Sequence, residues 1–463
     1  MILDMGQAYL YNCPRKRRIS MISVTLQAKT NVNVTPLASY AAKVCYTAEP
    51  PALGDLIKVK ERLFDPGHHT TLEHNHFTFL LDGLSVSSVV FGLHLNTPYY
   101  NSDQRSGRFS KMYDSPNMDE IRNNLKEIYP GEDIGKAFSF VQKGVDIYQA
   151  HIQPLTTLAA QVIREERPLA NDKYIEVNSK KFAQEQLRVF MSQVMPTALV
   201  TTLNVSALAA LWRTAWSPEM RLVTDKMRDE VLKAEPDIAY MFDDSKRQSI
   251  NWTPKMAFDT IQVKSAPTCR LISADITASS FPKMTDSVDI LPFSPLSMGN
   301  NINRVRTEVE LSCATMGQDQ RHRSIRRGEP VLTGGFYVPP LLQMAGLNET
   351  AQSYMQDYAD LRHSLSPALM VALSPYGAMA QYQKESSLNA LMHEQEKRLC
   401  WCAQEEIFEL ARQLREQLKA SYPDLADRLA PPCWQAGCRE GVRFCGRQVN
   451  KNLVPDYFMK RRV

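Results

Sequence analysis

Residues 318–329 read Gln-Asp-Gln-Arg-His-Arg-Ser-Ile-Arg-Arg-Gly-Glu, and the rest of the chain can be organised around them. Four arginines and a histidine in so short a stretch carry more charge than an ordinary buried turn. Guanidinium groups match phosphate oxygens two at a time, so the stretch suits an anionic ligand. On these residues alone, a solvated basic surface explains the pattern equally well.

A second stretch, much earlier in the chain, has a complementary composition. It runs from Asn101 to Tyr113 and contains Gln-Arg-Ser-Gly-Arg at 104–108. Ser106 lies between two arginines, and Gly107 gives the backbone freedom to approach a ligand. A small hydroxyl between two guanidinium groups again suits an anion, although a surface turn is the alternative for this stretch.

The overall composition predicts a globular protein without a polyanionic partner. The chain has 463 residues, enough for two or three domains, and 44% of them are hydrophobic. The net charge is only +4, so we expect no nucleic-acid or membrane partner, and any anion binding must come from local clusters. No apolar run reaches the roughly eighteen residues of a membrane helix. The basic run Arg15–Arg18 follows the apolar residues of the N-terminus, unlike in a secretory signal, so we expect a cytoplasmic protein.

The two halves of the chain repeat one pattern: strand, helix, loop, motif stretch, helices, proline, long helix. Strands are expected at 20–26, 76–81 and 269–276, and the last long helix at 386–418. A polar, breaker-rich stretch at 243–267 separates the halves. The predicted fold class is α+β, with two tandem domains that each pack a mixed sheet against long helices. The predicted boundaries are a tail at 1–19, domains at 20–245 and 266–425, a linker at 246–265 and a Cys-containing segment at 426–463.

The histidines at 68–74 form another candidate site. His68, Thr70, Glu73 and His74 lie in a loop before a strand, where they can bind a metal or orient a polar ligand. Their spacing differs from the four-residue helical spacing of zinc hydrolases. A network of hydrogen bonds within the loop is the alternative reading.

Nine cysteines, mostly scattered, favour reduced thiols over a disulfide framework. Cys433, Cys438 and Cys445 lie close together, and they can supply three of four zinc ligands, with a histidine, Cys400 or Cys402 completing the site. A Cys-rich loop packed on the last helix explains them equally well.

Together these stretches resemble the flavin-dependent (alternative) thymidylate synthases. That family joins Arg-His-Arg to a following Ser-x-Asn-Glu-x-Ser-x-Arg-Tyr, after a His-x-Thr-x-x-Glu-His loop and before a helix with Ala-Gln-x-Glu-Ile. The first half of this chain keeps His68–His74 and Gln104–Phe109 but has Asn96-Thr-Pro98 in place of Arg-His-Arg. The second half keeps Gln318–Arg323, Glu329, Arg398 and Ala403–Ile407 but has Val331 and Thr333 in place of Ser-x-Arg.

This complementary loss implies two fused thymidylate synthase-like domains that build one composite site. Ser106 and Arg398 are the catalytic residues that the resemblance implies. The implied substrate-binding residues are Gln104, Arg105, Ser106, Gly107, Arg108, Gln318, Arg321 and Arg398. The implied cofactor-binding residues are His68, Thr70, Glu73, Arg321, His322, Arg323 and Glu329.

The resemblance also implies an activity, which is transfer of a one-carbon unit to C5 of a pyrimidine deoxynucleotide. FAD carries the hydride, methylenetetrahydrofolate supplies the carbon and NADPH reduces the flavin, with dUMP to dTMP as the expected conversion. Gln104 stands where the family has Glu, which leaves open a related C5 hydroxymethylation or alkylation of another nucleotide such as dCMP. A degenerate paralogue that binds nucleotide without turnover is a further alternative. A homodimer of the fused chain would rebuild the family's four-domain assembly.

Overall fold

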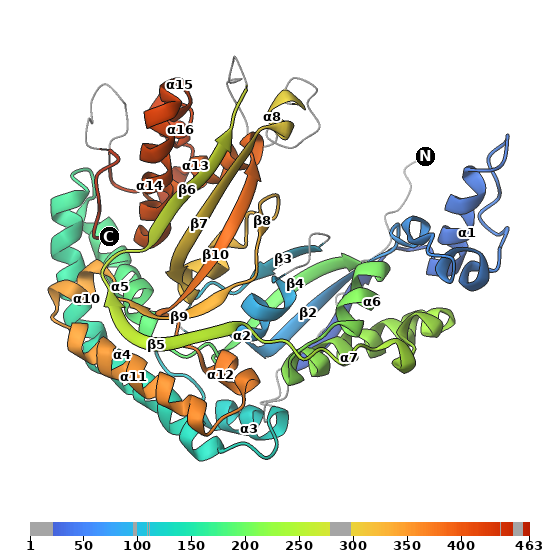
Figure 1. Cartoon of the computed structure of the whole chain (residues 1–463), viewed down its shortest axis with the longest axis horizontal. Coiled ribbons are helices and arrows are strands. Elements are labelled where there is room, and N and C mark those ends of the chain that lie inside the picture. The colour runs from blue at the N-terminus through green and yellow to red at the C-terminus, as the bar shows by residue number, and fades with distance from the viewer. Residues whose placement is uncertain are drawn as a thin grey trace.

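The computed structural model describes residues 22–95, 100–108, 110, 112–277, 298–435, 437–447 and 457–463. The basic run Arg15–Arg18, the Asn96-Thr-Pro98 stretch and Phe109 lie outside the described residues. Two sheets form the frame, with the sheet of the first half to the right and the sheet of the second half to the left in Figure 1. The predicted α+β class is confirmed.

The first sheet has the strand order β1-β2-β4-β3, and all of its neighbouring strands are antiparallel. Every second residue of β2 is apolar and buried, including Phe77, Phe79 and Leu81, as expected for a strand with one face on a core. Helices α6 and α7 pack against this sheet. The strands are β1 (Ser23–Lys29), β2 (His76–Ser85), β3 (Tyr100–Gln104) and β4 (Pro196–Asn204).

The second sheet has the order β5-β9-β10-β7-β6, and β8 pairs with β10. Only β5 runs parallel to its neighbour β9; the other pairs of described strands are antiparallel. The strands are β5 (Lys255–Lys264), β6 (Thr268–Asp275), β7 (Arg304–Ser312), β8 (Arg326–Arg327), β9 (Val331–Tyr337) and β10 (Ala378–Ser387). Thus β5 lies within the stretch predicted as a linker.

Helices fill the connections between the strands. In the first half they are α1 (Val34–Val44), α2 (Val86–Ser88), α3 (Met118–Ile128), α4 (Ile134–Glu166), α5 (Asp172–Leu187), α6 (Val205–Arg213) and α7 (Pro218–Ala234). In the second half they are α8 (Met298–Ile302), α9 (Cys313–Asp319), α10 (Pro340–Met344), α11 (Asn348–Asp360), α12 (Pro367–Leu373), α13 (Leu388–Arg398), α14 (Glu405–Ser421), α15 (Pro423–Ala426) and α16 (Pro432–Gln435). No described helix is long and apolar enough to cross a membrane.

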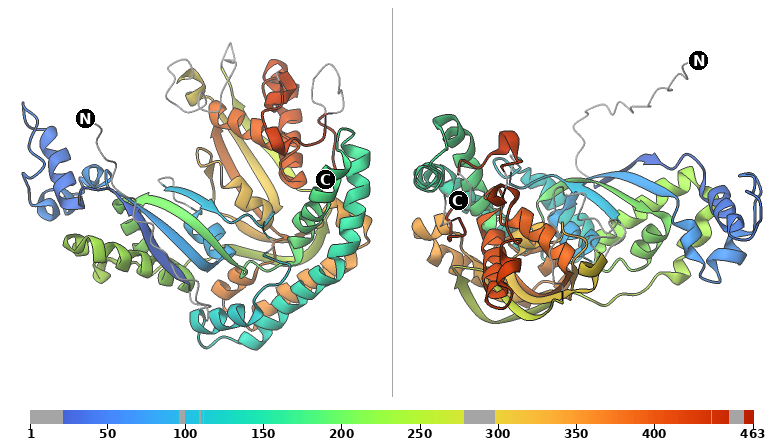
Figure 2. Two further views of the ribbon diagram at one scale, coloured as in Figure 1. Left: turned by 180° about the vertical axis from the view of Figure 1, so that it is seen from behind. Right: turned by 90° about the horizontal axis from the view of Figure 1, so that it is seen from above.

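The two halves interlock through a shared core. Figures 1 and 2 show that α4, from the first half, runs beside α11, from the second. Phe140 of α4 stacks on Tyr354 of α11 with ring centroids 4.6 Å apart. The C-terminus also returns to α4, where the Arg462 Nε donates to Glu166 at 2.8 Å. One apolar cluster therefore includes residues of both halves, and the halves hold each other in a fixed arrangement.

One local prediction was wrong. The helix expected at 386–418 is two helices, because Ser387 caps α13 and the chain turns between Leu399 and Gln404 before α14 begins. Helix α4 continues through Pro154. Strands β4 and β10, each in the interior of its sheet, were not predicted at all.

The halves repeat each other in topology and in detail. The order β1-β2-β4-β3 recurs as β6-β7-β10, with β8 and β9 both paired to β10 in the place of β3. At the end of β2, Ser85 N–H donates to the Glu219 carboxylate at 2.6 Å, and at the end of β7, Ser312 N–H donates to Glu406, also at 2.6 Å. Each serine also caps the helix that follows its strand. The repeated architecture fits a duplicated domain, whose boundaries stay a prediction.

Candidate functional site

The site begins where the arginine stretch of the second half meets a strand of the first. The Arg323 guanidinium donates to the backbone oxygen of Ser102 at 3.0 Å and to its hydroxyl at 3.1 Å. It also donates to the Asn101 side chain at 3.3 Å. Both acceptor residues belong to β3, whose end leads directly into the loop 105–108. The contact therefore places the two motif stretches beside each other.

A cavity of about 130 Å³ lies between these stretches. It is lined by all eight residues that the sequence predicts to bind substrate: Gln104, Arg105, Ser106, Gly107, Arg108, Gln318, Arg321 and Arg398. Ser106 and Arg321 come from different halves of the chain, so the cavity is composite. Their role in binding a nucleotide stays a prediction.

Arg188 and Tyr376 also line this cavity, and they were not among the predicted site residues. Arg188 is buried, donates to the Gln404 side chain at 2.8 Å and lies over the Tyr376 ring at 5.5 Å. In the family that the chain resembles, an arginine stands just before a proline. Arg188 stands ahead of Pro196, but farther from it than in that family. The short 3-10 turn Arg188–Phe190 lies between α5 and β4 and accounts for part of this distance.

Hydrogen bonds from the cavity residues fix its walls. Arg398 donates to the backbone oxygen of Gln318 at 2.6 Å, and the Gln318 side chain bonds to Gln404. Arg108 pairs with Glu185 and donates to the backbone oxygen of Cys402 at 3.0 Å. The loop between α13 and α14 therefore supports both walls of the cavity.

Several buried polar atoms of this site lack a partner within the described chain. They are Arg188 Nε, Arg398 Nε and Gln318 Oε1. A buried donor or acceptor without a partner costs about 1–3 kcal/mol, so such atoms are expected where a ligand completes the network. Burial, with smaller effects from Arg108 and Arg321, lowers the pKa of Arg398 to about 10 even though Glu394 opposes the shift. The cavity is thus rich in positive charge and in unused hydrogen-bonding groups.

A buried ionic network holds the arginine stretch in place from behind. Asp319 accepts hydrogen bonds from Arg327, Lys384 and the Tyr382 hydroxyl, the last at 2.9 Å. Burial opposes ionisation of Asp319, but Arg327 and Lys384 hold its pKa well below the ordinary value. Since Lys384 and Tyr382 belong to β10, the central strand of the sheet positions the site.

The predicted cofactor residues do not gather in one place. Arg321 lines the composite cavity, while Glu329 lines a different one. His322 is buried, and the centroid of its ring lies 5.5 Å from that of His393. Burial, together with the positive charge of Arg398, holds the pKa of His322 well below the ordinary value. His68, Thr70 and Glu73 are exposed, in or next to a short turn that packs on α1, and none of them lines either cavity. Within one chain, the structure does not bring this loop to Arg321.

The cysteines near the C-terminus do cluster. Cys433, Cys438 and Cys445 line a small cavity together with Cys400 and Cys402. However, the described residues contain no group of three or more His, Cys, Asp or Glu side chains arranged to hold a metal ion, so the zinc prediction gains no support. The described cysteines are free thiols. Cys400 and Cys402 of this cluster belong to the loop whose Cys402 carbonyl accepts from Arg108.

The fold and the site define an α+β protein with a cationic cavity built by two similar halves. Residues 29–237 match the family described as "Thymidylate synthase complementing protein". The match confirms the resemblance of this part of the chain to the flavin-dependent thymidylate synthases and the enzyme class that the resemblance implies. The match ends before the second sheet begins.

Solved structures of this family also align with the chain. Thymidylate synthase X from Helicobacter pylori, solved with FAD and dUMP, has 18% identity, covers 49% of this chain and 100% of its own, and gives a TM-score of 0.28. The UMP/dUMP methylase PolB from Streptomyces cacaoi, bound with 5-Br dUMP, has 17% identity, covers 50% of this chain and 98% of its own, and gives a TM-score of 0.32. Scores this low carry no weight for the geometry of the site. No curated protein matches the chain.

Proposed function

We propose that the chain is a flavin-dependent enzyme that transfers a one-carbon unit to C5 of a pyrimidine deoxynucleotide, most simply dUMP to dTMP. One observation carries the proposal: residues from both motif stretches line a single cationic cavity. The family match over residues 29–237 supports the reaction class. Methylenetetrahydrofolate as carbon donor and NADPH as reductant follow from the family resemblance.

The residues of the cavity suit a nucleotide monophosphate. Arg188, Arg321 and Arg398 offer guanidinium groups to the phosphate, which bind such oxygens in charge-assisted pairs. Ser106 and the Gly107 backbone supply smaller hydrogen-bonding groups from the opposite wall. In this arrangement the protein orients the nucleotide and balances its charge, and Ser106 and Arg398 touch the reacting molecule.

The chain also has groups that fit a flavin beside this cavity. The buried His322 Nε2 has no partner in the described chain, and the low pKa of the ring keeps it neutral at pH 7. A neutral ring nitrogen can donate to or accept from the edge of an isoalloxazine, and Arg321 can face a pyrophosphate. FAD, when bound, supplies the hydride chemistry. We propose that the exposed His68, Thr70 and Glu73 contact the flavin from a second copy of the chain, because one chain keeps them away from Arg321. A homodimer would supply that copy.

The absorption spectrum of the purified protein tests the flavin, and dUMP-dependent oxidation of NADPH tests the reaction. We expect a yellow protein, or a colourless one that takes up added FAD, and faster NADPH oxidation with dUMP present. Mass spectrometry of products from dUMP and dCMP distinguishes methylation of dUMP from modification of another pyrimidine. Light scattering of the FAD-loaded protein tests the dimer. A protein that never takes up FAD would refute the enzyme and leave a nucleotide-binding role.

A further inference from the structure

A second cavity, of about 680 Å³, occupies the place that corresponds to the nucleotide cavity in the repeat. In the first sheet, Ser102 of β3 pairs with Thr201 of β4, and in the second sheet Arg327 of β8 pairs with Lys384 of β10. Counted from these pairs, Glu329 corresponds to Gln104 and Pro330 to Arg105. Glu329 and Pro330 line the second cavity as Gln104 and Arg105 line the first.

The anion-binding groups of the first cavity are missing at the corresponding positions around the second. Counted from the capping serines Ser85 and Ser312, Phe91 takes the place of Gln318 and His94 that of Arg321. Counted from the caps of α6 and α13, Ala215 takes the place of Arg398. Burial, with Arg323 and Arg321 nearby, lowers the pKa of His94 to about 3, so this side chain is uncharged at pH 7. These exchanges remove the positive charge that a nucleotide phosphate needs.

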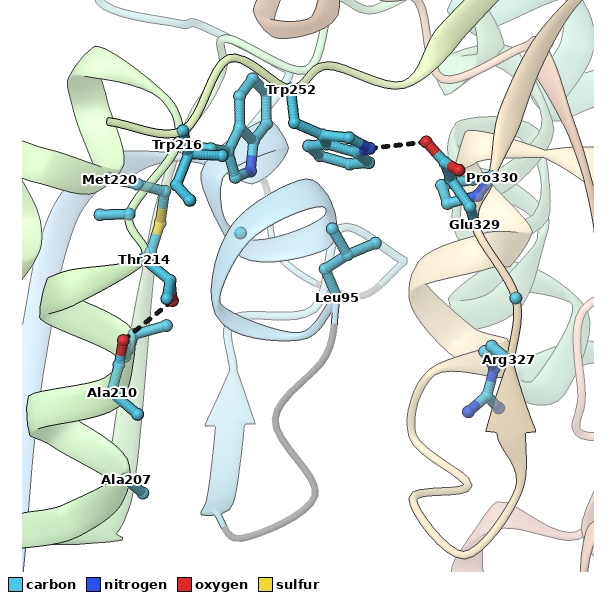
Figure 3. Close-up of a pocket in the computed structure, with 15 residues that line it drawn as sticks. Leu95, Ala207, Ala210, Thr214, Trp216, Met220, Trp252, Arg327, Glu329 and Pro330 are labelled. Atoms are coloured by element: carbon cyan, nitrogen blue, oxygen red, sulfur yellow. Dashed lines mark hydrogen bonds between the residues drawn. The ribbon is translucent and has the colours of Figure 1, made fainter. Parts of the chain in front are cut away.

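The walls of the second cavity are apolar and aromatic, as Figure 3 shows. Trp216 and Trp252 meet edge to face with centroids 5.2 Å apart. Trp216 Nε1 donates to the Phe91 backbone oxygen at 2.7 Å, and Trp252 Nε1 donates to the Glu329 carboxylate at 2.6 Å. Both indole N–H groups are therefore satisfied, and the rings present their apolar surfaces. Small residues of α6, Ala207 and Ala210, leave the space open on the other side.

The charge of this cavity comes from Glu329. Arg327 also lines it, but its guanidinium pairs with the buried Asp319 and donates to the backbone oxygens of His322 at 3.2 Å and Ile325 at 2.9 Å. That arginine is thus already neutralised and held by the protein. Glu329 is exposed and can accept further hydrogen bonds, since a carboxylate has about four acceptor positions.

We propose that the second cavity binds a flat, neutral or cationic heteroaromatic molecule of two or three rings. Its ring lies against Trp216 and Trp252, and its N–H groups donate to Glu329. The volume lies within the range of small-molecule sites, and aromatic walls with one polar anchor are typical of them. The proposal needs neither the flavin nor the transfer reaction, because it depends on this cavity alone.

Isothermal titration of the full chain with 2,4-diaminopteridine tests the proposal, because this probe combines two fused rings with N–H donors on one edge. We expect saturable binding to the wild type. Glu329→Gln should weaken it at least tenfold, because the amide loses the charge but still accepts from Trp252. Ala210→Phe should abolish binding by filling the space beside α6, where Ala210 is exposed and a larger side chain is compatible with the fold.

Titration of Ala210→Phe with dUMP provides the control. Unchanged dUMP binding in this variant would show that it is folded and that the two cavities act separately. Three results would overturn the proposal: no binding of the probe by the wild type at about 1 mM, equal binding by Ala210→Phe, or equal binding of an anionic pteridine carboxylate.

Discussion

Replacing Arg321 by glutamine tests the composite cavity with little risk to the fold. The Arg321 side chain is exposed and lines the cavity, and in the described chain it makes no hydrogen bond or ion pair of its own. Of the charged groups near it, Asp103 attracts the guanidinium, whereas Arg108 and Arg323 repel it. The substitution therefore removes no hydrogen bond or ion pair within the described chain, and its main effect should fall on the ligand.

The expected loss follows from the hydrogen bonds that a guanidinium gives to a phosphate. A hydrogen bond to a charged group contributes about 1.5–3 kcal/mol. Since about 1.4 kcal/mol changes an affinity tenfold, Arg321→Gln should weaken dUMP binding by roughly 10- to 150-fold. A surface substitution without internal contacts changes the free energy of unfolding by no more than about 0.5 kcal/mol, so the melting temperature should stay nearly constant.

Isothermal titration with dUMP and thermal melts of the free protein measure both effects. Arg326→Gln is the matched control, because Arg326 is also exposed and belongs to the same stretch but does not line the cavity. It should bind dUMP as the wild type does. The composite cavity is wrong if Arg321→Gln binds dUMP normally, or if Arg326→Gln loses as much affinity.

Three further predictions concern the support of the site. In Gly107→Ala the added Cβ would lie 2.5 Å from the hydroxyl of the fully buried Tyr113, so titration should show much weaker dUMP binding and denaturation a loss of about 1–3 kcal/mol. Ser312→Ala removes a helix cap and a hydrogen bond to Glu406, and urea denaturation should show a loss of about 2–4 kcal/mol. Burial and nearby carboxylates raise the pKa of Glu405 to about 8, so the folded protein favours the protonated side chain. The contribution of Glu405 to the free energy of unfolding is therefore fully present below pH 4.5 and is lost as the pH rises towards 8. In Glu405→Gln the free energy of unfolding should therefore fall less steeply over that range, by up to roughly 1 kcal/mol per pH unit; equal slopes would refute the assignment.

Sequence reasoning found the cavity residues because they lie in short, dense motifs. Ser106 and Arg321 belong to stretches whose composition suits an anion or a solvated surface, and the resemblance supplied the idea that they face each other across one site. Arg188 was missed because it comes from a helix end far from both motifs and reaches the cavity only through the packing of α5. No local pattern of charges marks such a residue.

Strand β10 was missed for a different reason. Strand β10 has the sequence Ala-Met-Ala-Gln-Tyr-Gln-Lys-Glu-Ser-Ser, which lacks the β-branched residues that favour strands. Lys384 in this strand is partly buried and pairs with Asp319 and Glu394, so its charge is balanced by residues outside the strand. Tertiary pairing, which periodicity does not report, determines this strand.

The unequal cavities have a common electrostatic explanation. Guanidinium groups of Arg188, Arg321 and Arg398 around one cavity repel one another, and burial adds a desolvation cost that an anionic ligand offsets. A second cavity of the same composition would carry the same cost whenever it lacked its ligand. Phe91, His94 and Ala215 remove that cost while the repeated backbone keeps the space. Because different residues line the two cavities, one can carry the positive charge that suits a phosphate while the other suits a neutral or cationic aromatic molecule.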